Sequence, residues 1–306
     1  MIDTEKFNKL KTTYGLAIRA NMEDRYRKGE LIELPPTGDL IVLGDLHGNR
    51  DNFNKVIAAA GLGSNPDRHL IVQEPTHTYE TAKDESFLLV AEIAELKSLF
   101  PHQVHLILGN HELSEFTGKE LLKGGICYNI LFREGMKQEY GPHFEEIREL
   151  MYAFMQTMPL ACKTPNQIFV SHSTPELKYI PHYSLEFFRQ GTGNPKKDKV
   201  LIEKLVWGRD LSQQAADAFA AQVQSQVLIV GHTACKRGYQ IPNEKHIILD
   251  SKGIFATWLH FRLDRPYTHA DLKRKIQYIN KKTVKTMLER YRQMKENQQE
   301  SQQQGK

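Results

Sequence analysis

The sequence predicts an α/β fold: a layered β-sandwich that is flanked by helices and carries a helical insertion. Three observations support this fold class. Short apolar runs recur along the chain, and they lead into loops that hold Asp, Asn, Glu or His. Helical patterns lie between several of these runs, and strand patterns return towards the C-terminal end. Alternating strands and helices are typical of layered α/β proteins, which bind ligands where strands give way to loops at their carboxyl ends.

Each apolar run is short enough to form a buried strand, and the stretches between the runs have the spacing of amphipathic helices. Ser212 is expected to cap the last of these helices, because its hydroxyl can accept a hydrogen bond from a free N–H of the first turn. The expected strands are residues 40–43, 70–72, 104–108, 168–170 and 227–230, and the expected helices are residues 50–60, 84–100 and 212–223.

The chain is expected to consist of an N-terminal preface (residues 1–36), a main domain (37–265) and a C-terminal segment (266–306). In the preface, a charged pattern with an apolar stripe predicts a helix from about residue 4 to 27. The main domain is interrupted at about residues 113–157 by a stretch without an obvious strand. This stretch predicts a helical insertion, which is expected to cap the site.

Strand patterns return at residues 247–249 and 255–263, and they predict a second sheet that completes the sandwich. The pattern from 270 to about 295 predicts a helix, and the Gln-rich tail after it predicts disorder. Between Asp271 and Lys306 there are ten Lys or Arg against four Asp or Glu, so this segment carries a net charge of +6 and the rest of the chain about −2. A solvated helix face is the plain interpretation of such a segment, and contact with a partner or an anionic surface is the alternative.

The composition is that of a globular protein with a sizeable core, since 40% of its 306 residues are hydrophobic. The sequence has neither an apolar run of about 18 residues nor the apolar stretch of a signal peptide. We therefore expect a cytoplasmic protein without a membrane partner. The near-neutral body does not favour nucleic-acid binding. The three cysteines lie far apart, so we expect isolated thiols rather than disulfides or a zinc site.

Polar motifs follow four of the five expected strands. Side chains at the carboxyl ends of parallel strands converge on one pocket even when they are distant in sequence. Their carboxylate, imidazole and amide groups suit Mn²⁺, Fe or Zn²⁺ better than a thiolate-selecting site. In chain order the motifs are Gly44-Asp45-Leu46-His47-Gly48, Gly109-Asn110-His111-Glu112, His172 and Gly231-His232-Thr233. Taken singly, each motif could be an ordinary turn or a structural histidine. Because all four follow strands, one common site is favoured.

The three glycine-containing motifs resemble the GDxHG, GNHE and GHT blocks of the calcineurin-like metallophosphoesterase superfamily. The last motif resembles the phosphoprotein phosphatase (serine/threonine phosphatase) branch, because Ala234 stands where other branches often have a further histidine. The resemblance spans about residues 40–258 and implies the metallophosphoesterase fold. It also implies a hydrolase that holds two divalent metal ions, Mn²⁺ first and Fe or Zn²⁺ as alternatives, and attacks with metal-activated water.

The resemblance also implies roles for individual residues. Two ligands from the first motif would bind the first metal, and ligands from the other three would bind the second. His111 would act as the general acid for the leaving oxygen, and Asn110 would also contact the substrate. Glu112 receives no definite role. The implied ligands are Asp45 and His47 for the first metal and Asn110, His172 and His232 for the second.

The block after the second strand departs from the family pattern. The branch usually has GDxVDRG there, with an Asp that bridges the metals and an Arg that clamps the phosphate. This chain has Gln73-Glu74-Pro75-Thr76-His77. We expect Glu74 to be the bridging ligand, with a plain loop carboxylate as the alternative, and we take His77 as a non-ligand. Arg209 is expected to replace the missing clamp as a catalytic and substrate-binding residue, ahead of Lys236 and Arg237.

Three functions are compatible with these residues. The first is a metal-dependent phosphatase that acts on phosphoserine or phosphothreonine in proteins, or on a small phosphoester. The second is a dinucleoside polyphosphate hydrolase, which would bind its nucleotide through aromatic and basic residues of the insertion. The third is a degenerate phosphatase that serves as a phospho-binding scaffold, and only the altered second block supports it. The candidate nucleotide-binding residues are Tyr128, Phe132, Arg133 and Lys137.

Overall fold

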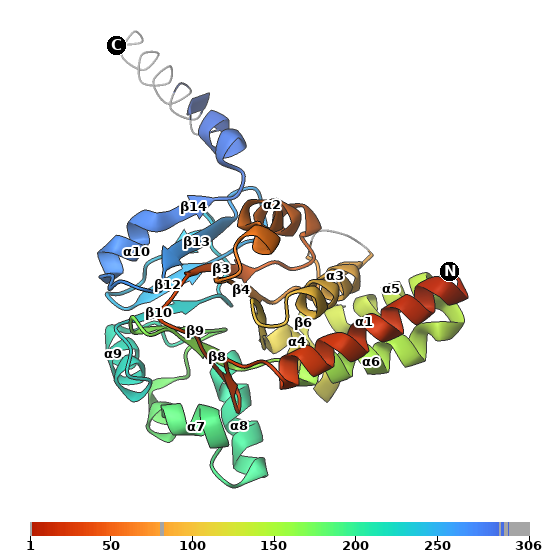
Figure 1. The fold of residues 1–306 in the computed structure, drawn as a ribbon, viewed down its shortest axis with the longest axis horizontal. Coiled ribbons are helices and arrows are strands. Elements are labelled where there is room, and N and C mark those ends of the chain that lie inside the picture. The colour runs from red at the N-terminus through yellow and green to blue at the C-terminus, as the bar shows by residue number, and fades with distance from the viewer. Residues whose placement is uncertain (1, 80–82, 288, 291–292, 294–306) are drawn as a thin grey trace.

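Two β-sheets form the centre of the molecule, and helices cover their outer faces (Figure 1). The computed structural model describes residues 2–79, 83–287, 289–290 and 293. The predicted layered sandwich is confirmed. Within the described part of the chain, no helix is both long enough and apolar enough to cross a bilayer.

The five-stranded sheet holds the first three predicted strands side by side. These strands run parallel, so their carboxyl ends lie at one edge of the sheet. Two antiparallel strands from the C-terminal part of the chain extend it on the other side. The spatial order is β14 (Ile276–Tyr278), β13 (Thr257–Arg262), β3 (Asp39–Asp45), β4 (Arg68–Gln73) and β5 (Val104–Ile107).

The seven-stranded sheet holds the last two predicted strands in its middle. β9 and β10 run parallel to each other, and β12 runs parallel to β10. The carboxyl ends of these three strands therefore also share one edge. The spatial order is β1 (Arg27–Lys28), β2 (Leu31–Glu33), β8 (Ala161–Lys163), β9 (Ile168–Ser171), β10 (Val227–Val230), β12 (His246–Leu249) and β11 (Tyr239–Gln240).

The strands alternate between two hydrophobic cores, because successive side chains of a strand point to opposite faces. In β3, Leu40 and Val42 belong to the cluster between the sheets, whereas Ile41 and Leu43 belong to the cluster under the helices. All four side chains are fully buried. Burying a side chain of this size stabilises the fold by about 1.5–3 kcal/mol, so β3 is anchored on both faces.

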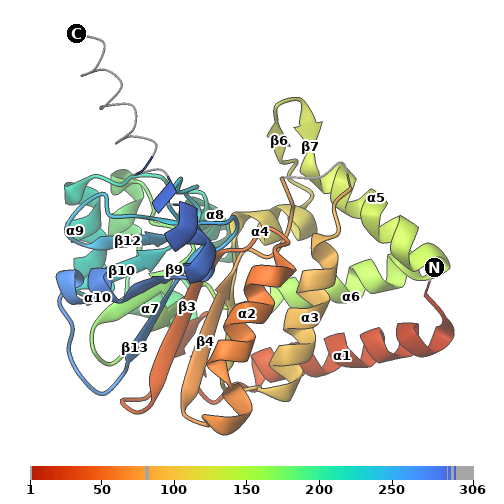
Figure 2. The same cartoon turned by 90° about the horizontal axis from the view of Figure 1, so that it is seen from above.

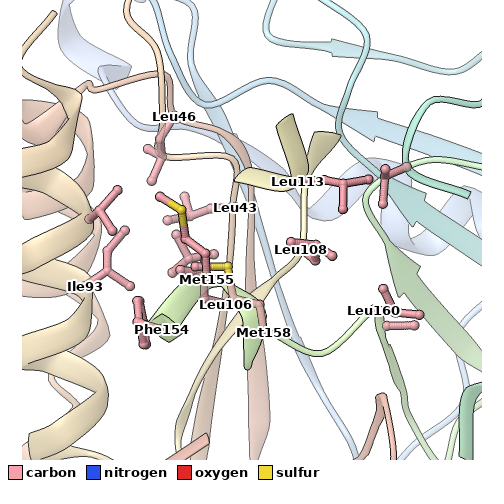
Figure 3. Close-up of a cluster of buried hydrophobic side chains, with 14 of the residues drawn as sticks. Leu43, Leu46, Ile93, Leu106, Leu108, Leu113, Phe154, Met155, Met158 and Leu160 are labelled. Atoms are coloured by element: carbon pink, nitrogen blue, oxygen red, sulfur yellow. The ribbon is translucent and has the colours of Figure 1, made fainter. Parts of the chain in front are cut away.

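Helices from distant parts of the chain cover the five-stranded sheet (Figure 2). α2 (Arg50–Ala60) and α3 (Ser86–Leu99) lie on its outer face, and α1 (Thr4–Met22), α5 (Tyr128–Tyr140) and α6 (Phe144–Gln156) pack beyond them. Figure 3 shows the buried side chains at this junction, with Leu43 of β3, Ile93 of α3 and Phe154 of α6 in one cluster. The first two predicted helices are thus confirmed.

The seven-stranded sheet is covered by α7 (Leu185–Gln190), α8 (Pro195–Val206) and α9 (Gln213–Gln222). The ring of Phe169 in β9 lies 5.2 Å from that of Phe188 in α7 and 5.8 Å from that of Phe219 in α9. Ser212 caps α9 as predicted, since its Oγ accepts a hydrogen bond from Ala215 N. The remaining helices are α4 (Asn110–Thr117) and α10 (His269–Lys275), with short 3₁₀ turns at Leu62–Ser64, Gly141–His143 and Leu177–His182.

The N-terminal helix is shorter than predicted. α1 ends at Met22, and β1 and β2 lie within the segment that was expected to be a helical preface. The reason is tertiary: Asp24 is buried and accepts a hydrogen bond from Lys97 Nζ at 2.8 Å, which fixes the chain on its way into the sheet. Residues 27–33 of the expected preface therefore belong to the sandwich.

The two strands predicted to form a second sheet lie in different sheets, so that grouping was wrong. β12 pairs with β10 in the seven-stranded sheet, and β13 pairs with β3 in the five-stranded sheet. The predicted C-terminal helix is also interrupted: α10 ends at Lys275, β14 pairs with β13, and helical turns resume at 281–287. The Gln-rich tail lies outside the described residues.

The insertion at 113–157 is mainly helical, as predicted, but it also contains a hairpin of β6 (Leu122–Lys123) and β7 (Ile126–Cys127). α5 and α6 pack against the other helices beside the sheet, while the hairpin projects away from them (Figure 2). Lys123 Nζ in the hairpin lies 4.4 Å from the centre of the Tyr79 ring.

Candidate metal centre

The two sheets meet at the carboxyl ends of β3 and β12. Asp45 and Asp250 form a parallel bridge, and Ser251 N donates a hydrogen bond to Asp45 O at 3.0 Å. Ser251 Oγ accepts a hydrogen bond from Gly44 N at 2.8 Å. The backbones of β3 and β12 can come this close only because residue 44 is a glycine: a Cβ at Gly44 would lie 1.9 Å from Leu249 O. The edges of both sheets therefore supply residues to one place.

The loops after β3 and β4 are bonded to each other through their backbones. Leu46 N and His47 N both donate to Glu74 O, at 3.1 and 2.9 Å. His47 and Glu74 have positive φ angles of 43° and 41°, which non-glycine residues rarely adopt. Strain of this kind is kept at functional sites when the surrounding structure enforces it. Here it turns the side chains of His47 and Glu74 towards each other.

A first group of candidate metal ligands consists of His47, Glu74 and His111. His47 Nε2 lies 3.2 Å and His111 Nε2 lies 3.7 Å from Glu74 Oε1, and all three residues are buried. His47 Nδ1 lies 3.0 Å from the carbonyl oxygen of Thr76, which can only accept a hydrogen bond. Nδ1 therefore carries the proton, and the lone pair of Nε2 faces the Glu74 carboxylate, as a metal ligand requires.

A second group consists of Glu74, His172 and His232. Glu74 Oε2 lies 2.8 Å from His172 Nε2, and this nitrogen lies 3.2 Å from His232 Nδ1. Asn110 Oδ1 completes the group, at 2.9 Å from His172 Nε2 and 2.7 Å from His232 Nδ1. Glu74 thus contributes one oxygen to each group.

Asp45 lies next to the second group. Its Oδ1 accepts a hydrogen bond from His232 N at 3.0 Å and lies 3.8 Å from His172 Nδ1. The backbone of Gly231 passes close to this carboxylate, because a Cβ there would lie 2.1 Å from Asp45 Oδ1. The structure therefore brings together all six residues that were expected to bind metals: Asp45, His47, Glu74, Asn110, His172 and His232.

The electrostatics of this cluster call for cations. Burial raises the pKa of Asp45 to about 8, and the negative charge of Glu74 adds to this effect. Burial, together with the charge of Glu112, raises the pKa of Glu74 well above its ordinary value. Burial lowers the pKa of His47, His172 and His232. Neutral imidazoles thus surround carboxylates that lack compensating charge, and two divalent ions between these oxygen and nitrogen donors would supply it.

Glu112, which received no definite role from the sequence, joins the loop after β4 to α4. Its Oε1 accepts hydrogen bonds from Thr76 N at 3.2 Å and from Thr76 Oγ1 at 2.5 Å. Its Oε2 accepts a hydrogen bond from Gly109 N at 3.2 Å. A Cβ at Gly109 would lie 2.6 Å from Glu112 Oε2 and 2.7 Å from Glu74 Oε2, so the backbone of Gly109 passes close to both carboxylates.

Arg209 lies on the surface beside the second group. The segment that carries Arg209 runs against the loop after β9, since a Cβ at Gly208 would lie 1.9 Å from Thr174 O. The Trp207 ring lies 6.3 Å from the His232 ring. Besides burial and the charge of His172, the positive charge of Arg209 lowers the pKa of His232. Lys236 and Arg237 are exposed on the loop after His232.

Four residues at the site were missed by the sequence reasoning: Tyr79, Lys252, His77 and Glu115. Tyr79 Oη lies 2.9 Å from His111 Nε2. Lys252, two residues beyond the sheet junction, lies with Nζ 5.0 Å from the centre of the Tyr79 ring. Burial lowers the pKa of His47 most, and the positive charge of Lys252 is the next largest cause. His77 belongs to neither ligand group, but it contacts His111, and Glu115 contacts His77. The spacing of four residues between His111 and Glu115 places both on one face of a helix and was an available signal.

Comparison with known proteins agrees with this architecture. Residues 39–236 match the family model described as calcineurin-like phosphoesterase. The chain is 22% identical over 228 residues to a probable serine/threonine-protein phosphatase of Encephalitozoon cuniculi, a match that covers 69% of this chain and 46% of that protein. The chain thus spans less than half the length of this relative.

Solved structures share the fold. A protein serine/threonine phosphatase from Saccharomyces cerevisiae, with similarity to human phosphatase PP5, aligns with a TM-score of 0.60 and 18% identity over 82% of each chain. A cold-active protein-tyrosine phosphatase of a psychrophilic Shewanella species aligns with a TM-score of 0.58 and 13% identity, over 81% of this chain and 80% of that one. At these identities the likeness establishes the fold alone.

The raised pKa of Asp45 predicts how the metal-free protein responds to pH. Because the folded state holds this proton up to about pH 8 while the unfolded chain releases it near pH 4, the associated stability is lost as pH rises between these values. Asn at this position keeps an acceptor for His232 N but cannot titrate. In urea unfolding with a chelator, we expect the wild type to lose more stability than Asp45→Asn between about pH 5 and 8. Parallel pH profiles for the two proteins would contradict this.

Proposed function

Because the chain belongs to the calcineurin-like phosphoesterase family, we propose that it is a metal-dependent phosphoester hydrolase of the serine/threonine protein phosphatase kind. One observation carries this proposal: the carboxylate of Glu74 lies between two groups of buried imidazoles and belongs to both. A bridging carboxylate between two cations is the arrangement that two-metal hydrolysis requires.

The residues around Glu74 would hold the two ions. Asp45 and His47 with one oxygen of Glu74 would hold one ion, and the other oxygen with Asn110, His172 and His232 would hold the second. We propose Mn²⁺ as the metal, with Fe or Zn²⁺ as alternatives, because these ions accept mixed oxygen and nitrogen ligands. When bound, the two ions supply Lewis-acid chemistry that activates water and neutralises phosphoryl oxygens.

We propose that His111 donates a proton to the leaving oxygen. Its Nε2 lies 3.7 Å from Glu74 Oε1, on the side of the ligand groups, so a phosphoester bound there would place its ester oxygen near this nitrogen. Arg209 would bind the phosphoryl oxygens from the other side, and Asn110 would contact the same group. A guanidinium suits this task because its planar fork of N–H groups matches the geometry of a phosphate.

The substrate that fits best is a phosphomonoester of serine or threonine in a protein, or a small phosphoester. The structure does not favour a dinucleoside polyphosphate. Phe132 is fully buried, with its ring 6.0 Å from that of Phe87 and 5.3 Å from that of His77, so it cannot stack on a base. Lys137 pairs with Glu134 at 2.7 Å on the outer side of the same helix.

A phospho-binding scaffold without turnover is the remaining alternative. Loss of function would leave a costly cluster of buried polar groups without a purpose, and such clusters are expensive to keep in a folded protein. Here the six candidate ligands and His111 are at most 7% exposed and lie together. The unusual sequence after β4 therefore replaces the proposed bridging Asp with Glu74, while the other candidate ligands stay together.

Removing the carboxylate of Glu74 tests the bridge. We expect wild-type protein loaded with Mn²⁺ to retain two ions per chain after desalting, and Glu74→Gln and Glu74→Ala to lose at least one, because each oxygen serves one group. Metal content is measured by mass spectrometry of the desalted protein. Glu120→Ala, at an exposed position, is the control and keeps both ions. Two tightly bound ions in Glu74→Ala would rule out the bridging role.

Replacing Arg209 tests whether this residue binds the phosphate in place of the arginine that the family usually has. Arg209→Ala is expected to lower kcat/KM for a phosphomonoester by roughly 10- to 100-fold, the loss of a charged hydrogen bond, without changing metal content. Lys236→Ala, on the loop after His232, is the matched comparison and is expected to change kcat/KM by less than about twofold. A large loss in Lys236→Ala with normal activity in Arg209→Ala would move the clamp to Lys236.

A substrate panel tests the reaction itself. With Mn²⁺ bound, the protein is expected to hydrolyse p-nitrophenyl phosphate and phosphoserine or phosphothreonine peptides, and to be poorly active on diadenosine tetraphosphate, because Phe132 of the insertion is buried and cannot stack on a base. Release of inorganic phosphate and of nucleotides is measured on the same preparation. Preference for diadenosine tetraphosphate would support the nucleotide hydrolase instead. Failure of every ester to react in metal-loaded protein would support the scaffold.

A further inference from the structure

Two lysine side chains from distant parts of the chain lie beside one aromatic ring at the metal centre. Lys123 Nζ lies 4.4 Å and Lys252 Nζ lies 5.0 Å from the centre of the Tyr79 ring. None of the described residues places a carboxylate within ion-pair distance of either ammonium group. An ammonium group is attracted to an aromatic ring, but two positive charges beside the same ring repel each other. A negatively charged group bound between them would relieve this repulsion.

Lys252 is held by the turn between β12 and β13. Asn52 Nδ2, in the first turn of α2, lies 2.9–3.1 Å from three successive carbonyl oxygens, those of residues 251–253. Lys252 N donates a hydrogen bond to Asp250 Oδ1 at 3.2 Å. The side chain, which is half-buried, therefore begins at a fixed point of the backbone. Its charge is felt in the metal centre, where it lowers the pKa of His47 after the larger effect of burial.

Lys123 is held by the hairpin of β6 and β7, which projects away from the neighbouring helices (Figure 2). It pairs with Ile126, and only Gly124 and Gly125 lie between them. These glycines have φ angles of 60° and 80°, the positive values that the tightest hairpin turns require. The two glycines therefore place Lys123, which is exposed, next to the tip of the hairpin.

Tyr79 links these charges to the candidate metal ligands. Its ring lies 4.5 Å from the His47 ring, and its Oη lies 2.9 Å from His111 Nε2. Burial, followed by the charges of Glu74 and Asp45, raises the pKa of Tyr79, so the phenol is neutral and leaves the lysine charges uncompensated. An ester whose leaving oxygen lies near His111 Nε2 would therefore carry its leaving group past Tyr79.

In a phosphorylated protein, the leaving group is the peptide chain itself. The residues on both sides of a phosphoserine would then lie on the side of Tyr79. An extended chain advances about 3.3–3.6 Å per residue, so a side chain one to three residues away can reach a lysine that lies one aromatic ring beyond His111. Carboxylate and phosphate groups are the ones that two ammonium groups attract.

We propose that Lys123 and Lys252 form a subsite for a second negative charge on the substrate, so that the enzyme prefers phosphoserine or phosphothreonine with an acidic or phosphorylated neighbour. The proposal rests on the proposed function, because it concerns the substrate of the same site, and it adds no chemical step. Complementary charge of this kind raises the rate of association and selects among partners.

Four peptides of equal length test the subsite in Mn²⁺-loaded protein. Each has a central phosphoserine, flanked on both sides by alanine, by glutamate, by lysine, or by a second phosphoserine on one side. We expect kcat/KM of the wild type for the glutamate peptide to exceed that for the alanine peptide by roughly 5- to 20-fold. A phosphate carries about −1.5 to −2 charges, so the preference for the doubly phosphorylated peptide is expected to be larger. Both preferences are expected to fall at least twofold in ~0.5 M salt.

Variants are compared by the ratio of kcat/KM for the glutamate and alanine peptides, because a change in metal loading affects both peptides equally. Lys123→Ala and Lys252→Ala are each expected to lower this ratio, and the double variant is expected to bring it to about one. Lys123→Glu combined with Lys252→Glu is expected to prefer the lysine peptide. Lys119→Ala is the matched control: Lys119 Nζ lies 4.9 Å from the centre of the Trp207 ring, but it pairs with Glu203. This variant keeps the wild-type ratio.

Binding without turnover gives a second readout. Metal-loaded His111→Asn is expected to bind substrate but to react slowly, because it lacks the proposed proton donor. In calorimetry, the glutamate peptide is expected to bind to this variant roughly 5- to 20-fold more tightly than the alanine peptide. Equal affinities would contradict the subsite.

Equal kcat/KM values of the wild type for the alanine, glutamate and doubly phosphorylated peptides, or an unchanged ratio in the double alanine variant, would overturn the subsite while leaving the phosphatase proposal intact. Equal losses for every peptide and for p-nitrophenyl phosphate in that variant would show that the lysines act on the phosphoryl group itself, and would overturn it too. Failure of the wild type to hydrolyse any of the peptides would instead refute the proposed function.

Discussion

The carboxylate of Glu74 is buried between two groups of neutral imidazoles, with the carboxylate of Asp45 beside it, and the rest of the site is arranged around this charge. Two buried carboxylates without cations are costly, because desolvation and mutual repulsion both oppose their ionisation. The positive φ angles of His47 and Glu74 add strain to that cost. Cations bound between these side chains would offset that cost, and two divalent ions would fit the two groups.

The fold follows from the need to place this cluster. Ligand-bearing loops come from both sheets, so the sheets must meet at their carboxyl ends, and the close approach of Gly44 to Leu249 O allows this. Glu112 then joins the loop after β4 to the start of α4 through its two oxygens. The sandwich therefore holds the candidate ligands on loops whose ends are rigid strands, which is how precise sites are usually supported.

The strands, the family and the six candidate ligands were accessible from the sequence because each rests on a local pattern: a short apolar run followed by a polar motif with glycine. Sheet membership was not accessible, since β12 and β13 have similar local patterns but pair with strands of different sheets. The contact between His77 and His111 was not accessible either. His77 follows β4 and His111 lies in α4, and only the folded chain brings them together.

Crystals grown with Mn²⁺ offer the most direct test of the central claim, through anomalous scattering at the manganese absorption edge. The account predicts two anomalous peaks about 3.5–4 Å apart, one on each side of the Glu74 carboxylate, with His47 next to one and His172 and His232 next to the other. A single peak, or two peaks with Glu74 turned away from both, would contradict it.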